Sequence, residues 1–394
     1  MMFADKIRKR SAELESELIR IRRHIHANPE LSFEEEETAR FIESCLDQWN
    51  IPHARVAGTG VTGLIRASKP GRYGVLRADT DALPIQEQSG AEYSSTRDGI
   101  MHACGHDVHT ASLLGAVRIL AESPEDWEGT IRFLFQPGEE LLPGGALKVL
   151  ESGLLYDPKP DFVLAQHVYP ELPAGYAGFR PGPYMASTDE IYITVKGTGG
   201  HGALPHKLVD PVLIASHIVI SLQQVISRQI PADVPTVLSF GRFDARGSTN
   251  VIPPEVNLAG TFRSMDETWR KKAHDLIART AEGIAVAMGG AAEIRIVDGY
   301  PSLSNHPELA RKAMLAAREF LGAPEKVEEL PLRMTGEDFA RYAQIFPSLF
   351  YRLGTGGPDK NNPVHHPGFD VEESSIRHGA GLLAFLAARL CSSV

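Results

Sequence analysis

The hydrophobic positions in the first part of the chain form short apolar runs separated by stretches of helical periodicity. Continuous apolar runs flanked by helices predict the strands of a buried sheet that is at least partly parallel. The runs are residues 61–65, 74–77, 131–135 and 162–165. Ser32 and Glu35 have the spacing of a capping box, and apolar residues then recur at helical period. We therefore expect a helix from about Ser32 to Trp49.

The middle of the chain has a different rhythm, in which strand-like and helical segments alternate. Strands are predicted at residues 191–195, 236–240, 256–262 and 292–297, and helices at 211–230 and 268–288. The order βαββαβ is typical of the ferredoxin-like fold. We place an inserted domain at residues 187–298 and expect residues 1–186 and 299–394 to form one discontinuous domain. Within its second part we predict a helix at 307–320, a strand at 349–353 and a final helix at 371–390.

These patterns predict an α/β protein with a mixed-sheet domain, helices on both of its faces, and an inserted ferredoxin-like α+β domain. The length of 394 residues also favours two domains over one. The net charge of −10 provides no basic field for nucleic acid. The N-terminus is charged and lacks the apolar stretch of a secretory signal. We expect a cytoplasmic protein without membrane contact, and three scattered cysteines argue against a disulfide framework.

Polar side chains follow the predicted strands at the ends where open α/β sheets bind their ligands. They are Asp79 and Asp81, the run from His102 to His109, Glu139 and Glu140, His167, and the pair His365 and His366. A lone histidine is more often an ordinary core or surface residue. Four strand ends that each deliver carboxylate, imidazole or thiolate instead predict one convergent metal site. This mixture of ligands favours zinc or a neighbouring transition metal over magnesium or calcium.

Adjacent glutamates suggest how such a site would work. Beside a metal, one of Glu139 and Glu140 can ligate while the other acts as a general base. A solvated acidic turn is the simpler interpretation, but a buried strand and a proline-glycine turn precede the pair. Cys104 stands among histidines and could instead be a nucleophile, which would leave the glutamates without roles. A third possibility is a catalytically silent, metal-dependent binding protein, although such a protein would not need the base.

Nine motifs in order carry a resemblance that covers nearly the whole chain. They occupy residues 22–26, 29–31, 77–84, 102–109, 136–140, 199–203, 250–253, 260–263 and 336–339. The sequence resembles the metallo-aminoacylase and carboxypeptidase family, in the branch of N-acyl-amino-acid amidohydrolases, hippurate hydrolases and plant indole-acetyl-amino-acid hydrolases. The resemblance implies a catalytic domain with two divalent transition-metal ions per subunit, either zinc, manganese, cobalt or nickel. It also implies that the inserted domain serves as a lid and as the contact surface of a homodimer or homotetramer.

The resemblance assigns roles position by position. The implied metal ligands are Cys104, His106, Glu140, His167 and His365. Motif alignment favours His365 over His366 as the last of these. Glu139 is the implied base, and Asp81 is expected to orient a ligand. His201 matches a histidine that reaches the reacting carbonyl, often from the partner subunit, and Asn250 and Arg263 match residues that hold the substrate.

The expected reaction is hydrolysis of the amide bond of a small N-acyl amino acid by metal-activated water. Glu139 would take a proton from the water and later give it to the leaving amine. A dipeptidase or carboxypeptidase, or an N-acetyl-diaminopimelate deacetylase, would show much the same ligands. The sequence leaves these alternatives open.

Overall fold

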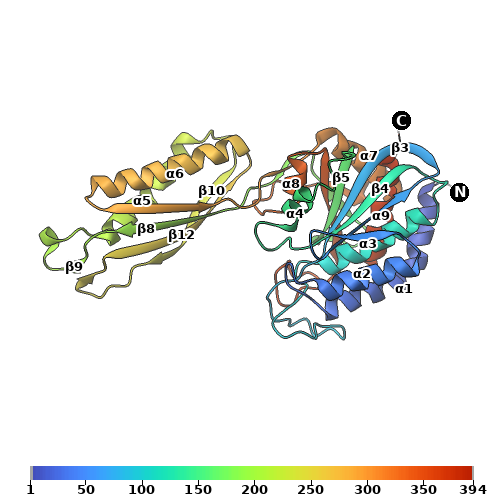
Figure 1. The fold of residues 1–394 in the computed structure, drawn as a ribbon, viewed down its shortest axis with the longest axis horizontal. Coiled ribbons are helices and arrows are strands. Elements are labelled where there is room, and N and C mark those ends of the chain that lie inside the picture. The colour runs from blue at the N-terminus through green and yellow to red at the C-terminus, as the bar shows by residue number, and fades with distance from the viewer. Residues whose placement is uncertain (1–2, 393–394) are drawn as a thin grey trace. The chain divides into compact units, whose positions relative to one another are not determined.

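An eight-stranded mixed sheet forms the centre of the first of two structural units in the computed structural model, which describes residues 3–392 (Figure 1). This unit comprises the chain up to Gly182, Ser304–Pro331 and the residues from Asp338 onward. Its strands follow in the spatial order β1 (His53–Val56), β2 (Gly60–Arg66), β4 (Glu128–Gln136), β3 (Lys69–Asp79), β5 (Phe162–Pro173), β16 (Ser348–Gly356), β6 (Ala177–Phe179) and β15 (Val327–Glu329).

The centre of this sheet is parallel, as the continuous apolar runs predicted. β3 runs parallel to β4 and β5, and β5 runs parallel to β16. Consecutive residues are buried from Gly74 to Asp79 and throughout β16, so both faces of the sheet are covered there. Because these four strands run the same way, their carboxyl ends lie at one edge of the sheet.

Helices pack against this sheet and against one another. They are α1 (Phe3–Ala27), α2 (Glu36–Gln48), α3 (His106–Ala121), α4 (Gly145–Glu151), α7 (Pro307–Leu321), α8 (Ala340–Ala343) and α9 (Ser374–Cys391). The hydrophobic pattern had not led us to predict α1, although its apolar stripe from Ile7 through Leu14 and Leu18 to Ile25 is buried. α3 packs between α1 and α9, and nearly all of its side chains are buried.

The predicted capping box is wrong. α2 begins at Glu36, and the Glu30 carboxylate caps it by accepting from the N–H groups of Glu37 at 3.2 Å and Thr38 at 2.8 Å. The Ser32 hydroxyl donates instead to Asp81 Oδ2 at 2.7 Å, and the Glu35 carboxylate accepts from the Gly138 N–H at 2.8 Å. Both side chains therefore satisfy partners that are distant in sequence, which local spacing could not reveal.

The second unit, Pro183–Leu303 with Leu332–Glu337, contains the predicted βαββαβ order. Its elements are β8 (Asp189–Lys196), α5 (Pro211–Gln224), β10 (Thr236–Asp244), β12 (Glu255–Ser264), α6 (Glu267–Ala287) and β13 (Ala291–Val297). The strands pair antiparallel in the order β10-β12-β8-β13, which is the ferredoxin-like arrangement. The predicted helix 211–230 is interrupted, because Val225–Gln229 forms a π-helical turn after α5.

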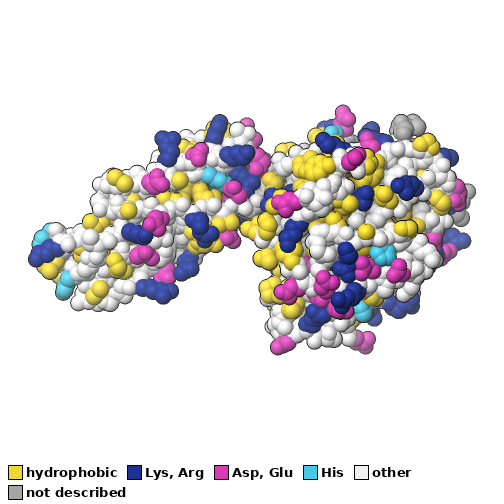
Figure 2. Space-filling model, in the orientation of Figure 1, with side chains coloured by type: hydrophobic (Ala, Val, Ile, Leu, Met, Phe, Trp, Pro, Cys, Tyr) yellow, Lys and Arg dark blue, Asp and Glu magenta, His cyan; other side chains and the backbone are white. Residues whose placement is uncertain are grey.

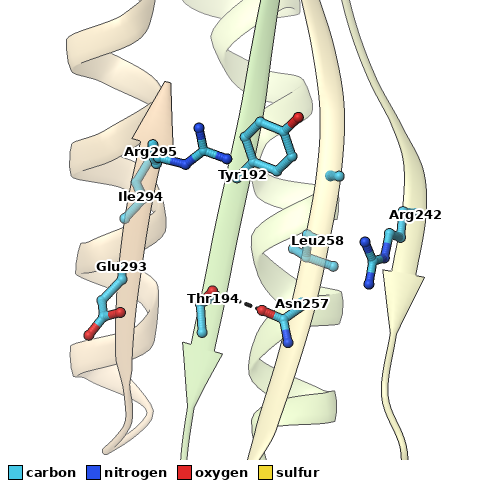
Figure 3. A pocket seen from close by; sticks show the side chains of 9 residues that line it. Tyr192, Thr194, Arg242, Asn257, Leu258, Glu293, Ile294 and Arg295 are labelled. Atoms are coloured by element: carbon cyan, nitrogen blue, oxygen red, sulfur yellow. Dashed lines mark hydrogen bonds between the residues drawn. The ribbon is translucent and has the colours of Figure 1, made fainter. Parts of the chain in front are cut away.

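The two faces of this smaller sheet differ in polarity. Ile191, Ile193 and Val195 of β8 are buried in a core shared with α5 and α6. The opposite face carries polar side chains such as Tyr192 and Thr194, around a hollow of about 370 Å³ (Figure 3). Beyond the sheet, β9 (Gly200–His201) pairs with β11 (Val251–Ile252). The short strands β7 (Gly182–Met185) and β14 (Leu303–Asn305) lie where the chain passes between the units.

Acidic and basic side chains are interspersed on the visible surface of each unit (Figure 2). None of the helices in the described part of the chain has both the length and the hydropathy that a membrane span requires. All three cysteines are free and buried.

Candidate metal centre

The five predicted metal ligands lie in one cluster of the first unit. Their donor atoms form overlapping groups whose members lie within 4.8 Å of one another: Cys104, His106 and His167; Cys104, Glu140 and His365; and His106, Glu139 and Glu140. His167 lies on β5, and the other residues follow β3, β4 and β16 in the chain. The common direction of these strands brings together residues that are up to 261 positions apart, from Cys104 to His365.

A sharp turn at the start of α3 presents Cys104 and His106. Gly105 between them has φ +81°, a left-handed conformation that favours glycine. A Cβ atom at this position would also lie 2.6 Å from a Val168 methyl carbon. Glycine is therefore needed both for the backbone turn and for the close approach of β5.

Asp81 holds the His106 ring in position. His106 Nδ1 lies 2.9 Å from the Asp81 carbonyl oxygen and 3.2 Å from its Oδ1. These acceptors place the ring proton on Nδ1 and leave Nε2 free to bind a metal. Asp81 is itself fixed, because its Oδ2 accepts from Ser32 and from the Glu140 N–H at 2.9 Å.

A backbone carbonyl orients the His167 ring, and a backbone hydrogen bond holds the chain at His365. His167 Nδ1 lies 2.8 Å from the Val168 carbonyl oxygen, and its Nε2 faces Cys104 Sγ at 3.4 Å. The backbone of His365 has φ +66°, and its backbone N–H donates to the Ala103 carbonyl at 2.7 Å. Strained backbone of this kind is frequent at functional sites. His365 Nε2 lies 3.2 Å from Glu140 Oε1, whereas His366 Nδ1 accepts from Gly368 in its own exposed loop.

The residues present fit a cation. His106 Nε2 is buried and has no hydrogen-bond partner. Leaving such an atom unsatisfied costs about 1–3 kcal/mol. Burial by itself lowers the pKa of His106, but the charges of Asp79 and Cys104 raise it well above its ordinary value. Hydrogen bonds to Cys104 and Glu140 raise the pKa of His365 to about 10. Both raised pKa values show that the electrostatic potential of the cluster is negative, which would also favour the binding of a divalent cation.

Glu139 occupies a different environment from Glu140. It is buried, with 7% of its surface exposed, and its Oε1 accepts from the Asp338 N–H at 3.3 Å. Its carboxylate nevertheless lies within 4.8 Å of the donor atoms of His106 and Glu140. The two adjacent glutamates thus face the same cluster, but different residues hold them in place.

His109 stands next to the cluster without a free donor atom. Its Nδ1 lies 2.5 Å from Asp79 Oδ1, and its Nε2 accepts from the Val168 N–H at 2.8 Å. Since both nitrogens are used, His109 supports the site rather than binding metal. Asp79 also pairs with Arg77 at 2.6 Å. Sequence reasoning named Asp79 and His109 as strand-end residues but missed this supporting role.

A buried ion network behind the cluster was also missed. Arg22 Nε lies 2.6 Å from Asp107 Oδ2, and its Nη2 lies 2.8 Å from Asp370 Oδ1. His26 Nδ1 lies 2.8 Å from the same Asp107 oxygen. Asp107 follows His106, and Asp370 lies five residues after His365. Arg22 therefore connects α1 to the start of α3, which carries His106, and to the segment that carries His365.

The remaining predicted site residues lie in the second unit. His201 is exposed on β9, which pairs with β11 directly after Asn250. The carbonyl of Asn250 accepts from the Gly202 N–H at 2.8 Å. Arg263 lies on β12, where burial lowers the pKa of its guanidinium. The β9–β11 pair adjoins the Glu255 end of β12, because β11 ends at Ile252 and β12 begins three residues later.

Arg263 lies eight residues from that end of β12, which is about 26 Å along a strand. The structure thus brings His201 and Asn250 together but separates both from Arg263 within the unit.

A family model described as Peptidase family M20/M25/M40 matches residues 75–389. The chain belongs to this family. The resemblance predicted from the motifs is thereby confirmed. The strands and helices from β3 to α9, which position the predicted metal ligands, lie at least partly within the matched range.

Relatives within the M20/M25/M40 family match the chain over most of its length. An N-acetylcysteine deacetylase of Bacillus subtilis is 38% identical over 379 residues, which are 96% of this chain and 97% of that protein. An N-acyl-L-amino acid amidohydrolase of Geobacillus stearothermophilus is 41% identical over 308 residues, or 78% of this chain and 83% of that protein.

A solved structure with a similar sequence also has the same fold. The YxeP protein of Bacillus subtilis is described as a dinuclear metal-binding peptidase of the M20 family. It is 35% identical, has a TM-score of 0.83, and the match covers 97% of this chain and 100% of that chain. Together with the ligand groups found here, it supports a centre for two divalent metal ions.

Proposed function

We propose that this protein hydrolyses the amide bond of small N-acyl amino acids at a centre of two divalent metal ions. The position of Glu139 is the observation that carries the proposal. This carboxylate is buried beside the ligand cluster, within 4.8 Å of the donor atoms of His106 and Glu140. A water molecule held at the cluster would therefore lie close enough to exchange a proton with Glu139. The names of the two curated relatives describe hydrolysis of N-acylated amino acids, which agrees with this chemistry.

Each residue of the cluster has a defined task in this proposal. Cys104, His106, Glu140, His167 and His365 hold the ions, and Asp81 orients His106. When bound, the divalent ions supply the Lewis acidity that activates water and polarises the amide carbonyl. Glu139 accepts the proton of the attacking water and donates it to the leaving amine, which contributes roughly 100- to 10,000-fold to the rate.

The donor set narrows the identity of the metal. A thiolate together with imidazoles and carboxylates suits zinc, manganese, cobalt or nickel better than magnesium or calcium. Metal analysis of the protein as purified, followed by reconstitution of chelated protein with each ion, identifies the ion that restores activity. Activity that is unchanged after complete removal of metal would contradict the proposal.

The second unit supports a site shared between two subunits. A small N-acyl amino acid is about as long as a dipeptide, or roughly 7 Å. Within one chain Arg263 lies about 26 Å along β12 from the end of the sheet next to His201, so such a molecule is too short to touch both residues. A homodimer resolves this conflict if the partner subunit contributes one of the two residues.

The surface of the second unit is suited to such an association. Leu213 and Ile220 on α5 expose 51% and 71% of their surfaces, and Phe243 on the edge strand β10 exposes 44%. Apolar side chains beside an unpaired strand edge favour contact with another chain. We infer that this face joins two copies and that His201 acts on the partner's substrate.

The substitution Glu139→Gln tests the general base. It should lower kcat by at least about 100-fold while metal content and fold are retained. Glu151→Gln, on the exposed end of α4, is the matched control and should have normal activity. Near-normal turnover by Glu139→Gln would remove this residue from the mechanism.

Subunit mixing tests the shared site. Inactive Glu139→Gln chains mixed with inactive His201→Ala chains should regain up to about half of the sites per heterodimer, because one composite site receives both intact residues. Exchange of subunits is measured separately by mass spectrometry. Exchanged heterodimers that stay inactive would show that His201 does not act in trans.

A substrate screen separates the proposed activity from its alternatives. Acetyl-, benzoyl- and indoleacetyl-amino acids are compared with dipeptides and with N-acetyl-diaminopimelate at equal concentration. The proposal predicts the highest kcat/KM on one of the N-acyl amino acids. A preference for dipeptides would instead place the protein with the carboxypeptidase-like relatives, such as the thermostable carboxypeptidase 2 of Saccharolobus solfataricus, which is 36% identical.

A further inference from the structure

A small basic cavity lies in the first unit, and none of its lining residues belongs to the metal centre. It has a volume of about 260 Å³ and is formed by residues from α1, α7, α9 and the segment after α7. The side chains that give it its character are Arg8, Ser11, Phe320, Lys326, Arg377 and His378. Phe320 and Ser11 are buried.

The positive charges around this cavity exceed the negative charges that neutralise them. Arg8 pairs with Asp5, and Arg377 Nη1 lies 3.2 Å from Glu15 Oε2. Both pairs are partly exposed, so solvent weakens them. Lys326 has no ion pair with any residue that the structure describes. Among the described residues, two ion pairs therefore accompany the three cations that line the cavity, and Arg8 Nη1 also donates to the Phe320 carbonyl at 2.6 Å.

His378 adds an imidazole that has no hydrogen-bond partner among the described residues. Burial, together with the positive charges of Arg377 and Lys326, lowers the pKa of His378 to about 4. The ring is therefore neutral at pH 7 and can donate one hydrogen bond through its N–H. A ligand that carries negative charge would interact favourably with Lys326, Arg377 and the N–H of His378.

We propose that this cavity binds a small oxyanion with two negative charges, either a phosphate ester or a dicarboxylate. The planar guanidinium group of Arg377 suits oxyanions, Lys326 adds a mobile point charge, and Arg8 contributes positive charge at the rim. The volume lies below the range of about 300–1,000 Å³ that is usual for drug-sized ligands, which favours a compact anion. The site is independent of the proposed hydrolytic activity.

The occupant would link elements that are distant in sequence. Arg8 is near the start of α1, Lys326 follows α7, and Arg377 and His378 are in the first turns of α9. α9 packs on α1 and on α3, the helix that begins at the metal ligand His106. A bound anion would therefore stabilise the helical layer next to the metal centre. A rise in Tm of at least about 2 °C at saturation is expected.

Calorimetric titration of the metal-loaded protein tests the proposal. Inorganic phosphate and succinate are titrated separately at constant ionic strength, with chloride as the reference anion. Lys326→Gln, which removes no ion pair, and the double substitution Lys326→Gln with Arg377→Gln should weaken binding by at least about 10-fold. Lys312→Gln, on the exposed face of α7, is the matched control and should bind as the unsubstituted protein does.

The His378 ring signals separate this cavity from the metal centre, which can also bind phosphate. In NMR titrations a bound anion should raise the pKa of His378, and Lys312→Gln should preserve that shift. Binding of phosphate alone identifies a phosphate ester as the ligand class, and binding of succinate alone identifies a dicarboxylate. The proposal is overturned if neither anion binds at millimolar concentration, if the Lys326 and Arg377 variants bind normally, or if the His378 signals do not respond.

Discussion

The substitution Arg22→Met should destabilise the first unit by about 3–5 kcal/mol, the usual cost of removing one partner from a buried ion pair. Arg22 is fully buried, and its guanidinium contacts Asp107 at 2.6 Å and Asp370 at 2.8 Å. Methionine is apolar and fills much of the same space. The two carboxylates would then stay buried without the cation that they share.

The neighbouring Arg23 provides a matched control on the same helix. It also forms an ion pair, with Glu373 at 2.6 Å, but 42% of its side chain is exposed. Arg23→Met should therefore cost about 1 kcal/mol or less. Urea unfolding followed by circular dichroism measures both losses, and amide hydrogen exchange in α1 locates them. Equal losses for the two variants would refute the assignment of Arg22 as the centre of the network.

The pH dependence gives an independent check. Burial by itself raises the pKa of Asp107, but the charges of Arg22 and His26 lower it far below its ordinary value. A carboxylate with a lowered pKa stabilises the folded state above the unfolded value of about 3.9, and this contribution disappears as the pH falls through the folded value. The difference in stability between the unsubstituted protein and Arg22→Met should therefore narrow below about pH 4.

Two further predictions concern the metal centre itself. Cys104→Ala should lose bound metal and activity together, whereas the control Cys45→Ala, which removes a buried cysteine of α2, should keep its full metal content. Atomic absorption measures the metal content of both proteins. Full metal occupancy in Cys104→Ala would refute the ligand set. Asp81→Asn should lower metal affinity by about 10- to 100-fold. The Asp81 carboxylate accepts from the Glu140 N–H and from His106 Nδ1. The NH₂ group of asparagine cannot accept a hydrogen bond, so one of these two contacts is lost in Asp81→Asn. Unchanged affinity in chelator competition would show that Asp81 does not orient His106.

The main elements of the fold could be predicted because their signals are local. Apolar runs identified the parallel strands β3, β4, β5 and β16, and alternation with helical periodicity identified the ferredoxin-like order of the second unit. Burial on both faces of a strand and on one stripe of a helix leaves a pattern in a short window of sequence. The strand ends then predicted where carboxylate, imidazole and thiolate side chains would meet.

Which of these side chains bind and which support could be decided only by the tertiary structure. Ser32 and Glu35 looked like a helix cap, but their hydroxyl and carboxylate bond to Asp81 and Gly138. His109 resembles its neighbours in sequence, yet Asp79 and the Val168 N–H occupy both of its nitrogens. A hydrogen bond or ion pair between residues far apart in the chain leaves no periodic signal.

The sequence also could not show how far His201 lies from Arg263, because that separation depends on how distant segments pack. Family resemblance placed His201 and Arg263 on one substrate, since motifs carry residue types and order but no distances. The register of β12 with β8 puts the two residues at different ends of the second unit. The sequence alone thus determined the elements and the chemistry of the donor groups, because both are properties of short segments. Only the folded chain decided which groups touch, because contact depends on how distant segments pack.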